Sequence, residues 1–204
     1  MTRWGFLLAR SLRNEPALQR LSVPQAELLE TLRGKSVALV GNARALAQGA
    51  QGPAIDAAQV VIRINRAPMP GPQSHGTRTD WLALAVRLDD RDRDRIAPTR
   101  ILWMSPKRKR LDWQTATSPG FYLHPQADYQ ALRQRLEASP TTGAMMIALL
   151  LRSELARLDL FGFDFFASLS LSGRRTADQV PHDFKGESAW VRQIELADRR
   201  IFRH

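Results

Sequence analysis

The stretch that decides the fold runs from Ser36 to Asp80 and reads SVALVGNARALAQGAQGPAIDAAQVVIRINRAPMPGPQSHGTRTD. It begins with an apolar run, residues 36–40, that ends at Gly41-Asn42. A second apolar run, residues 59–64, ends at Asn65. Two buried strands that each end in a small or amide-bearing loop are typical of an open α/β sheet, where ligands bind outside the carboxyl ends of the strands. The pattern therefore predicts a nucleotide site at this edge.

Length and charge narrow the class of protein. The chain has 204 residues, which predicts a single domain over 1–204 with a substantial core. Its 30 basic and 20 acidic residues give a net charge of +10. This excess favours anionic partners such as nucleotides, nucleic acid, phosphorylated glycans or acidic membranes. There is no cysteine, which excludes disulfides, thiolate metal sites and cysteine nucleophiles and suits a reducing compartment.

The first 33 residues are expected to form a helical scaffold in two pieces, followed by the nucleotide-binding core over 36–204. An apolar block, Trp4 to Ala9, lies between arginines and is well short of the roughly 20 residues that a membrane span needs. No small-residue cleavage site follows it. We therefore expect a cytoplasmic protein. Two interpretations of the block remain open: a helix packed on the core, or a helix in the interface of an anionic membrane.

The remaining chain alternates apolar runs with helical patterns. We expect strands over 81–86, 100–104, 121–123 and 158–163, and helices over 126–138 and 144–155, the latter apolar enough to be buried. A last amphipathic helix is expected to run through Trp190 as far as Ile201. The glycines after the first strand have neither the dinucleotide-binding nor the P-loop spacing. Gly41 is expected to let a ligand approach the backbone, beside a helix N-terminus that can bind an anion.

Three charged features have structural as well as functional interpretations. Arg63, inside the second strand, is expected to pair with a carboxylate at a sheet edge or to face the ligand. The run Asp89 to Asp94 alternates with arginines, which favours a solvated helix face over a metal site. The run Lys107 to Arg110 is expected to be a solvated loop, with contact to phosphate groups of an acceptor or a membrane as the alternative.

Three segments in order carry a family resemblance. They are VGN…ID…VVIRINRAP…GTRTD over 40–80, PTTGAMMIALLL…LDLFGFD over 140–164, and a His-x4-Glu at His182 and Glu187. Together they resemble the large, small and very small sialylmotifs of the sialyltransferases of glycosyltransferase family twenty-nine. The resemblance covers about two-thirds of the chain, with an unmatched middle.

The resemblance implies a single-domain, Rossmann-like variant of the GT-A fold, with a mostly parallel sheet flanked by helices. It implies a CMP-activated 2-keto sugar acid as donor, a glycan or glycolipid acceptor, inversion at the anomeric carbon, and neither a cofactor nor a metal. Asn42 and Asn65 would bind the ribose and phosphate of CMP. The residues Thr141, Thr142 and Gly143 would meet the nucleotide at a helix start. His182 would be the general base and Glu187 its companion.

The chemistry of these residue types agrees with the implied roles. Histidine titrates near neutral pH and can take the proton of an acceptor hydroxyl. Amide donors and a helix N-terminus can stabilise the charge that develops on the leaving phosphate. Taken singly, each residue also has a structural interpretation: Asn42 and Asn65 as turn residues, a threonine as a helix cap, His182 as a loop histidine. The joint pattern favours function.

The sequence departs from the family in several places. The paired cysteines of the animal enzymes are absent, and so is a second histidine before the third motif; our hypothesis is that Arg174, Arg175 or Lys185 replaces its charge. Asp164 stands where the family has glycine. The donor sugar is either sialic acid or Kdo. Two rival functions are a catalytically silent CMP-binding or partner-docking protein and a nucleic-acid binder, the latter disfavoured by sparse aromatic residues and the lack of a recognisable reader motif.

Overall fold

The computed structural model describes residues 1–164 and 182–204, and its centre is a seven-stranded sheet. The strand order is β5-β4-β3-β2-β1-β6-β7, and every neighbouring pair is parallel. The strands are β1 (Ser36–Val40), β2 (Val60–Ile64), β3 (Trp81–Leu84), β4 (Arg100–Trp103), β5 (Tyr122–Leu123), β6 (Arg157–Phe161) and β7 (Ile201–Arg203). The predicted α/β class with a parallel sheet is confirmed, and the GT-A label stays a prediction.

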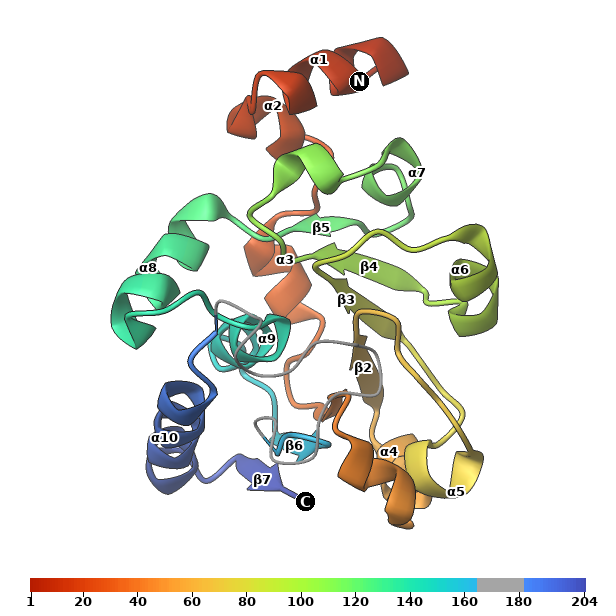
Figure 1. The fold of residues 1–204 in the computed structure, drawn as a ribbon, viewed down its shortest axis with the longest axis vertical. Helices are drawn as coiled ribbons and strands as arrows, with labels where there is room; N and C mark the ends of the chain where they lie inside the picture. The colour runs from red at the N-terminus through yellow and green to blue at the C-terminus, as the bar shows by residue number, and fades with distance from the viewer. Residues whose placement is uncertain (165–181) are drawn as a thin grey trace.

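Helices cover both faces of this sheet (Figure 1). One face is packed against α3 (Gln25–Glu30), α8 (Gln126–Leu136), α9 (Thr142–Leu150) and α10 (Phe184–Ala197). The other is packed against α1 (Arg3–Ser11), α2 (Glu15–Gln19), α4 (Gly52–Ala57), α6 (Asp90–Ile96) and α7 (Trp113–Ala116). Shorter elements are α5 (Pro72–His75) and the 3-10 helices η1 (Arg44–Gln48) and η2 (Arg108–Arg110).

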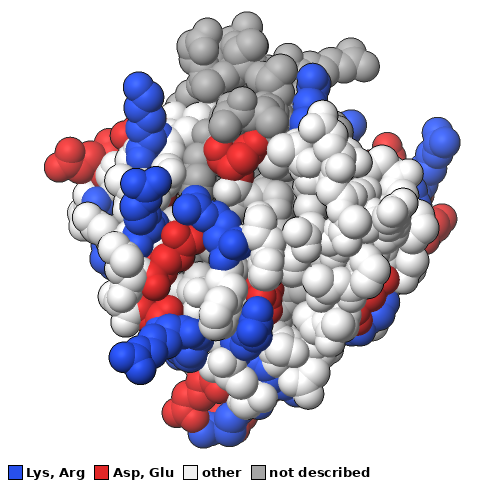
Figure 2. Space-filling view, turned by 90° about the horizontal axis from the view of Figure 1, so that it is seen from below, with Lys and Arg blue, Asp and Glu red and all other residues white. Residues whose placement is uncertain are grey.

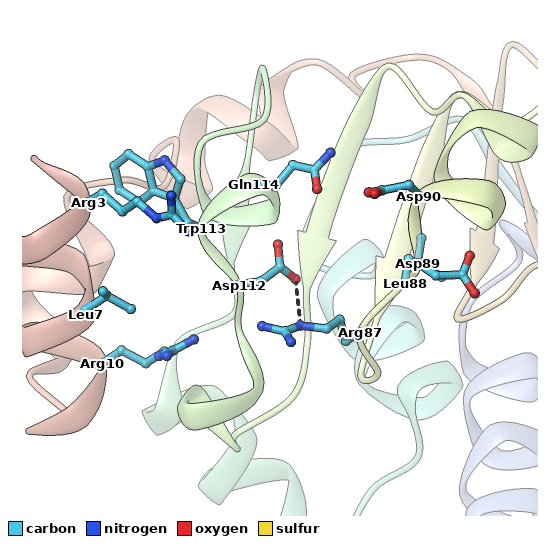
Figure 3. A pocket seen from close by; sticks show the side chains of 10 residues that line it. All are labelled: Arg3, Leu7, Arg10, Arg87, Leu88, Asp89, Asp90, Asp112, Trp113 and Gln114. Atoms are coloured by element: carbon cyan, nitrogen blue, oxygen red, sulfur yellow. Dashed lines mark ion pairs between the residues drawn. The ribbon is translucent and has the colours of Figure 1, made fainter.

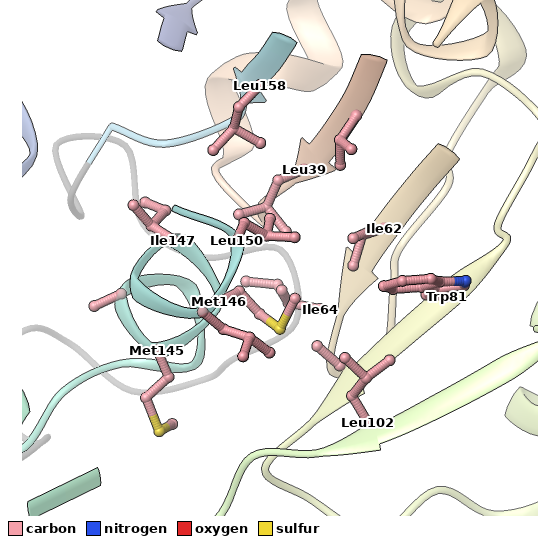
Figure 4. Packing of buried hydrophobic residues seen from close by; sticks show 14 of the residues in the cluster. Leu39, Ile62, Ile64, Trp81, Leu102, Met145, Met146, Ile147, Leu150 and Leu158 are labelled. Carbon is pink, nitrogen blue, oxygen red and sulfur yellow. The ribbon is translucent and has the colours of Figure 1, made fainter. Parts of the chain in front are cut away.

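The apolar helix α9 forms the centre of the larger core (Figure 4). All but one of its residues are buried, and Met146, Ile147 and Leu150 point toward the strands. They pack over Leu39 of β1 and Ile62 of β2 within one buried cluster. A buried helix has no polar face, so its uniform apolarity in the sequence follows from this position. The packing fixes where the N-terminus of α9 lies relative to the sheet.

The two ends of the chain differ from the sequence predictions. The first 33 residues form three helices, α1 to α3, where two pieces were expected. The last helix does not run to Ile201: it ends at Ala197, because Asp198 leaves the helical conformation with φ of −123°. Arg200 then turns back to bind the Asp198 carboxylate at 2.6 Å. Ile201 consequently begins β7, which pairs with β6 and buries the isoleucine.

Arg63 and Arg108 are buried for structural reasons. Arg63 lies in the middle of the sheet, not at its edge, and donates to the carbonyl oxygen of His75 at 2.6 Å instead of to a carboxylate. Burial lowers its pKa to about 10. Arg108, expected to be solvated, binds the Glu15 carboxylate at 2.5 Å and the carbonyl oxygen of His124. The expected pairing of Arg63 with a carboxylate at a sheet edge and the expected solvation of Arg108 were wrong, because the sequence does not show which polar groups surround a cation.

Candidate active site

The loops after β1 and β2 meet at the carboxyl edge of the sheet. Asn42, which follows β1 after Gly41, donates from Nδ2 to the carbonyl oxygen of Ile64 at 3.4 Å. Asn65, directly after β2, accepts at Oδ1 from the Ala85 N–H at 2.9 Å and donates to Thr142 Oγ1 at 3.5 Å. The two asparagines predicted to bind a nucleotide therefore lie side by side, next to the start of α9.

Asn65 also has a backbone reason for its identity. Its φ of 52° lies in the left-handed region, which asparagine enters more readily than most residues. This turn directs the chain away from the sheet while the side-chain amide stays tied to the loop after β3. The turn interpretation and the binding interpretation of Asn65 are thus compatible.

Gly41 is required by the protein's own packing, and Gly143 lies close to an aromatic side chain. A Cβ on Gly41 would lie 2.4 Å from the carbonyl oxygen of Gly162, and one on Gly143 would lie 2.6 Å from the ring of Phe163. The Gly41 N–H also binds the Phe161 carbonyl oxygen at 2.7 Å. Among the described residues, it is therefore the chain segment after β6, and not a ligand, that packs against Gly41.

The N-terminus of α9 has two N–H groups to offer. Thr141 caps the helix, because its Oγ1 accepts from the Ala144 N–H at 3.1 Å. The Thr141 N–H is bound to Glu187 Oε1 at 2.6 Å. The N–H groups of Thr142 and Gly143 have no acceptor among the described residues, as is usual in the first turn of a helix. Such a pair of donors, at the positive end of a helix, is suited to an anion.

Glu187 anchors α10 to this helix start. Its side chain is buried and accepts both from the Thr141 N–H and from Thr141 Oγ1, at 2.6 and 2.7 Å. Burial raises its pKa to about 7, although the bonds from Thr141 oppose the shift. Asp183 contributes a smaller upward effect. Near neutral pH this carboxyl group can therefore be protonated.

His182 precedes α10 and is oriented by the chain segment before Thr141. Its Nδ1 lies 2.6 Å from the carbonyl oxygen of Ser139. Because a carbonyl oxygen only accepts, Nδ1 must carry the proton in this bond, which leaves the lone pair on Nε2. Ser139 could not be identified as a site residue from its type, and its position one residue before the PTTG segment is the signal that was available.

The last part of the first motif lies away from this edge. Asp56 accepts from the N–H groups of Thr77 and Arg78 at 2.8 and 3.1 Å. Asp80 accepts from the Val61 N–H at 2.7 Å. These bonds lie at the amino ends of β2 and β3, opposite the asparagines. The GTRTD segment therefore stabilises the amino ends of these strands and does not belong to the candidate site.

A pocket of about 630 Å³ lies between α1 and the loops after β3 and β4 (Figure 3). Arg87 and Asp112, which form an ion pair at 3.6 Å, line its middle. Trp113 and Gln114 lie on the side of α7, and the other lining residues are Arg3, Leu7, Arg10, Leu88, Asp89 and Asp90. The Asp89–Asp94 run, predicted to be a helix face, supplies the start of α6 at this pocket.

Of the three residues proposed to supply a second positive charge for phosphate binding, the structure describes one. Arg174 and Arg175 lie outside the described residues, and Lys185 is exposed in the first turn of α10. The buried His75 and His124 belong to other parts of the fold. Within residues 1–164 and 182–204, no cluster of three or more His, Asp or Glu side chains is arranged to hold a metal ion.

The comparisons with known proteins agree with the resemblance seen in the sequence. The model of glycosyltransferase family 29 (sialyltransferase) matches residues 7–87. This match supports the prediction of the sialyltransferase family. The match spans about two fifths of the chain and includes both asparagines of the candidate site. No curated protein matches the chain.

Two solved structures share the fold of this family. One is a mammalian sialyltransferase, with a TM-score of 0.62, and the other is a mammalian sialyltransferase in complex with Gal-beta-1-3GalNAc-ortho-nitrophenol, with a TM-score of 0.60. Each is 20% identical and is matched by 84% of this chain over 69% of its own length. At this identity the likeness shows the fold. With the family match, it supports a sialyltransferase-like glycosyltransferase, as predicted.

Proposed function

We propose that the protein transfers a 2-keto sugar acid, sialic acid or Kdo, from its CMP donor to a glycan or glycolipid acceptor with inversion. In this reaction the acceptor oxygen bonds to the anomeric carbon while the bond from that carbon to the CMP phosphate breaks. The proton of the acceptor hydroxyl goes to His182 Nε2, and the phosphate leaves with the electron pair.

The observation that supports this proposal is the orientation of His182. The bond from Nδ1 to the Ser139 carbonyl oxygen holds the ring and leaves Nε2 as the basic nitrogen. The same short segment, residues 139–141, also binds Glu187 and begins α9. Residues 139–141 thus hold both the base and the anion-binding start of α9. This arrangement suits a reaction in which the acceptor attacks and the phosphate leaves at the same carbon.

The donor phosphate is proposed to bind the N–H groups of Thr142 and Gly143. Negative charge on this phosphate grows as the bond breaks, so fixed donors stabilise the transition state more than the ground state. Asn42 and Asn65 lie beside these groups and are proposed to hold the ribose and phosphate of CMP. No step of this proposal uses a metal ion.

The acceptor is proposed to enter through the pocket of Figure 3. The loop after β3 connects the two places, because Ala85 binds Asn65 while Arg87, two residues on, lines the pocket. The lining combines an indole, Trp113, with the charged and amide groups of Asp112 and Gln114. Such a mixture can contact the faces and the hydroxyl groups of a saccharide.

The decisive experiment separates binding from transfer in His182→Ala. General base catalysis contributes about 10² to 10⁴ in rate, so kcat for sugar transfer should fall by at least about 100-fold. The increase in melting temperature caused by CMP should persist, because the donor contacts remain. Wild-type turnover in this variant would overturn the base assignment.

A panel of CMP, CDP, UDP and GDP in the same melting assay tests the donor class. Selective stabilisation of the wild-type protein by CMP is expected. If CMP binds but neither CMP-sialic acid nor CMP-Kdo is consumed with any glycan acceptor, the protein is a silent CMP-binding member of its family. If no nucleotide stabilises it, the donor proposal fails.

A further inference from the structure

Helix α1 has two apolar faces, and only one of them is used by the fold. Phe6 and Ala9 are buried, and the Phe6 ring packs against Trp113 at 5.4 Å between centroids. On the outer side, Trp4, Leu8 and Leu12 are 82%, 62% and 69% exposed. Their spacing of four residues places them in one stripe along the helix. Large apolar side chains gathered in this way indicate an interaction surface.

Exposed basic side chains lie in the same N-terminal segment as this stripe. Arg3 and Arg13 belong to the segment of α1, and Arg20 follows α2. The segment 1–20 contains one acidic residue, Glu15, whose carboxylate is occupied by Arg108. The N-terminal helices are therefore basic where they are exposed.

The fold brings a second basic segment to the same place. The 3-10 helix η2 lies against α1, where Arg10 donates to the Leu111 carbonyl oxygen at 2.8 Å. Lys107, Lys109 and Arg110 are exposed there, while Arg108 between them points inward. None of the exposed cations in these two segments forms an ion pair with a described residue. Two segments that are about a hundred residues apart in sequence are thus neighbours in the fold.

We propose that one surface, formed by Trp4, Leu8 and Leu12 with the exposed cations of residues 3–20 and 107–110, binds an anionic lipid bilayer. Leucines would enter the headgroup boundary, the tryptophan would lie at its level, and the cations would meet lipid phosphates. A second copy of the chain would place these uncompensated charges against one another, which disfavours it as the occupant.

The position of α1 suits such a contact. The helix lies at one end of the molecule, beside the chain's N-terminus (Figure 1). On the face at the opposite end, basic and acidic side chains are interspersed and much of the surface is uncharged (Figure 2). The inner side of α1 also lines the pocket, through Leu7 and Arg10. Bilayer contact would bring this pocket close to the lipid headgroups.

Vesicle flotation with the full chain tests the proposal without any use of transfer activity. Wild-type protein should float with vesicles of phosphatidylcholine and phosphatidylglycerol and not with phosphatidylcholine alone, and Trp4 should shift the protein's fluorescence to shorter wavelength. Leu8→Glu and Leu12→Glu should each weaken binding about ten-fold or more, given the apolar area each leucine buries. Lys109→Glu should weaken binding less, and the difference should shrink in high salt.

Matched controls are available on α10. Leu196 is 84% exposed and Arg192 lies one turn before it, so Leu196→Glu and Arg192→Glu make the same chemical changes elsewhere. Both should bind vesicles as wild type does, and all variants should melt as wild type does. Absence of wild-type binding, or equal losses in the α10 controls, would overturn the proposal. So would loss of a dimer, instead of loss of vesicle binding, in Leu8→Glu.

Discussion

Replacement of Glu187 by glutamine should change how the stability of the protein depends on pH. The folded protein holds this carboxyl group with a pKa of about 7, against an ordinary value of 4.5, because the group is buried. The raised pKa means that the folded state retains the proton while the unfolded state releases it. Stability is therefore lost as pH rises from 4.5 through 7, and the loss amounts to about 3 kcal/mol above pH 7.

Glutamine reproduces the contacts of the protonated acid. Its carbonyl oxygen can accept from the Thr141 N–H, and its NH₂ group can donate to Thr141 Oγ1. Glu187→Gln should therefore match the wild type at pH 4.5 and exceed its free energy of unfolding by up to about 3 kcal/mol at pH 8.5. Urea unfolding at both values of pH measures this difference.

The difference between variant and wild type is the quantity that matters, because other groups titrate in the same range. Burial lowers the pKa of His124 to about 4, so neutralisation of this histidine stabilises the folded state as pH rises toward 6.5. The two effects oppose each other in the wild type, but the effect of His124 is the same in both proteins and cancels from their difference, which leaves the effect of Glu187. Glu27→Gln, at an exposed position, is the control. Equal stability differences at the two values of pH in Glu187→Gln would refute the reasoning.

Three further predictions follow from buried contacts. Gly41→Ala should lower the free energy of unfolding by more than about 3 kcal/mol, because its Cβ would meet a carbonyl oxygen at 2.4 Å; Gly71→Ala, with nothing within 4 Å, should be near neutral in the same urea titration. His124→Phe should remove the loss of stability, about 3 kcal/mol, that the wild type suffers as pH falls from 6.5 through 4; an unchanged acid limb in thermal melts would contradict this. Arg108→Met should cost about 3 kcal/mol because it removes every bond of a buried guanidinium, to Glu15 and to two carbonyl oxygens, whereas Glu15→Gln should cost less because its amide oxygen can still accept from Arg108; equal losses in chemical unfolding would contradict this.

Most strands could be predicted because each combines an apolar run with a clear stop. The run before Gly41 and the run before Asn65 ended within a residue of the observed strands. The strand that begins at Ile201 could not be predicted in this way. Three residues after a helix are too few to show the alternating pattern of a strand, and they form one only because they pair with the exposed edge of β6. Pairing partners far along the chain are not visible in a local pattern.

The candidate site was predictable as a list of residues but not as a set of contacts. The motifs named these residues, and the structure joins Thr141 to Glu187 through two short bonds and Asn65 to Thr142 through one longer contact. The sequence did not indicate that Ser139 would fix the tautomer of His182, since a backbone carbonyl has no signature. Nor could the sequence show whether Gly41 is a glycine because the chain packs tightly against it or because a ligand approaches the backbone there.

The pairing of β1 has a consequence for biosynthesis. One edge of this strand pairs with β2, which follows it closely in the sequence. Its other edge can pair only after β6 has been synthesised, because Ser36 pairs with Arg157. A ribosome adds the intervening roughly 120 residues in about 6 to 24 seconds. During that time the open edge of β1 is available to other strands, so nascent or truncated chains that stop before β6 should depend on chaperones to remain unaggregated.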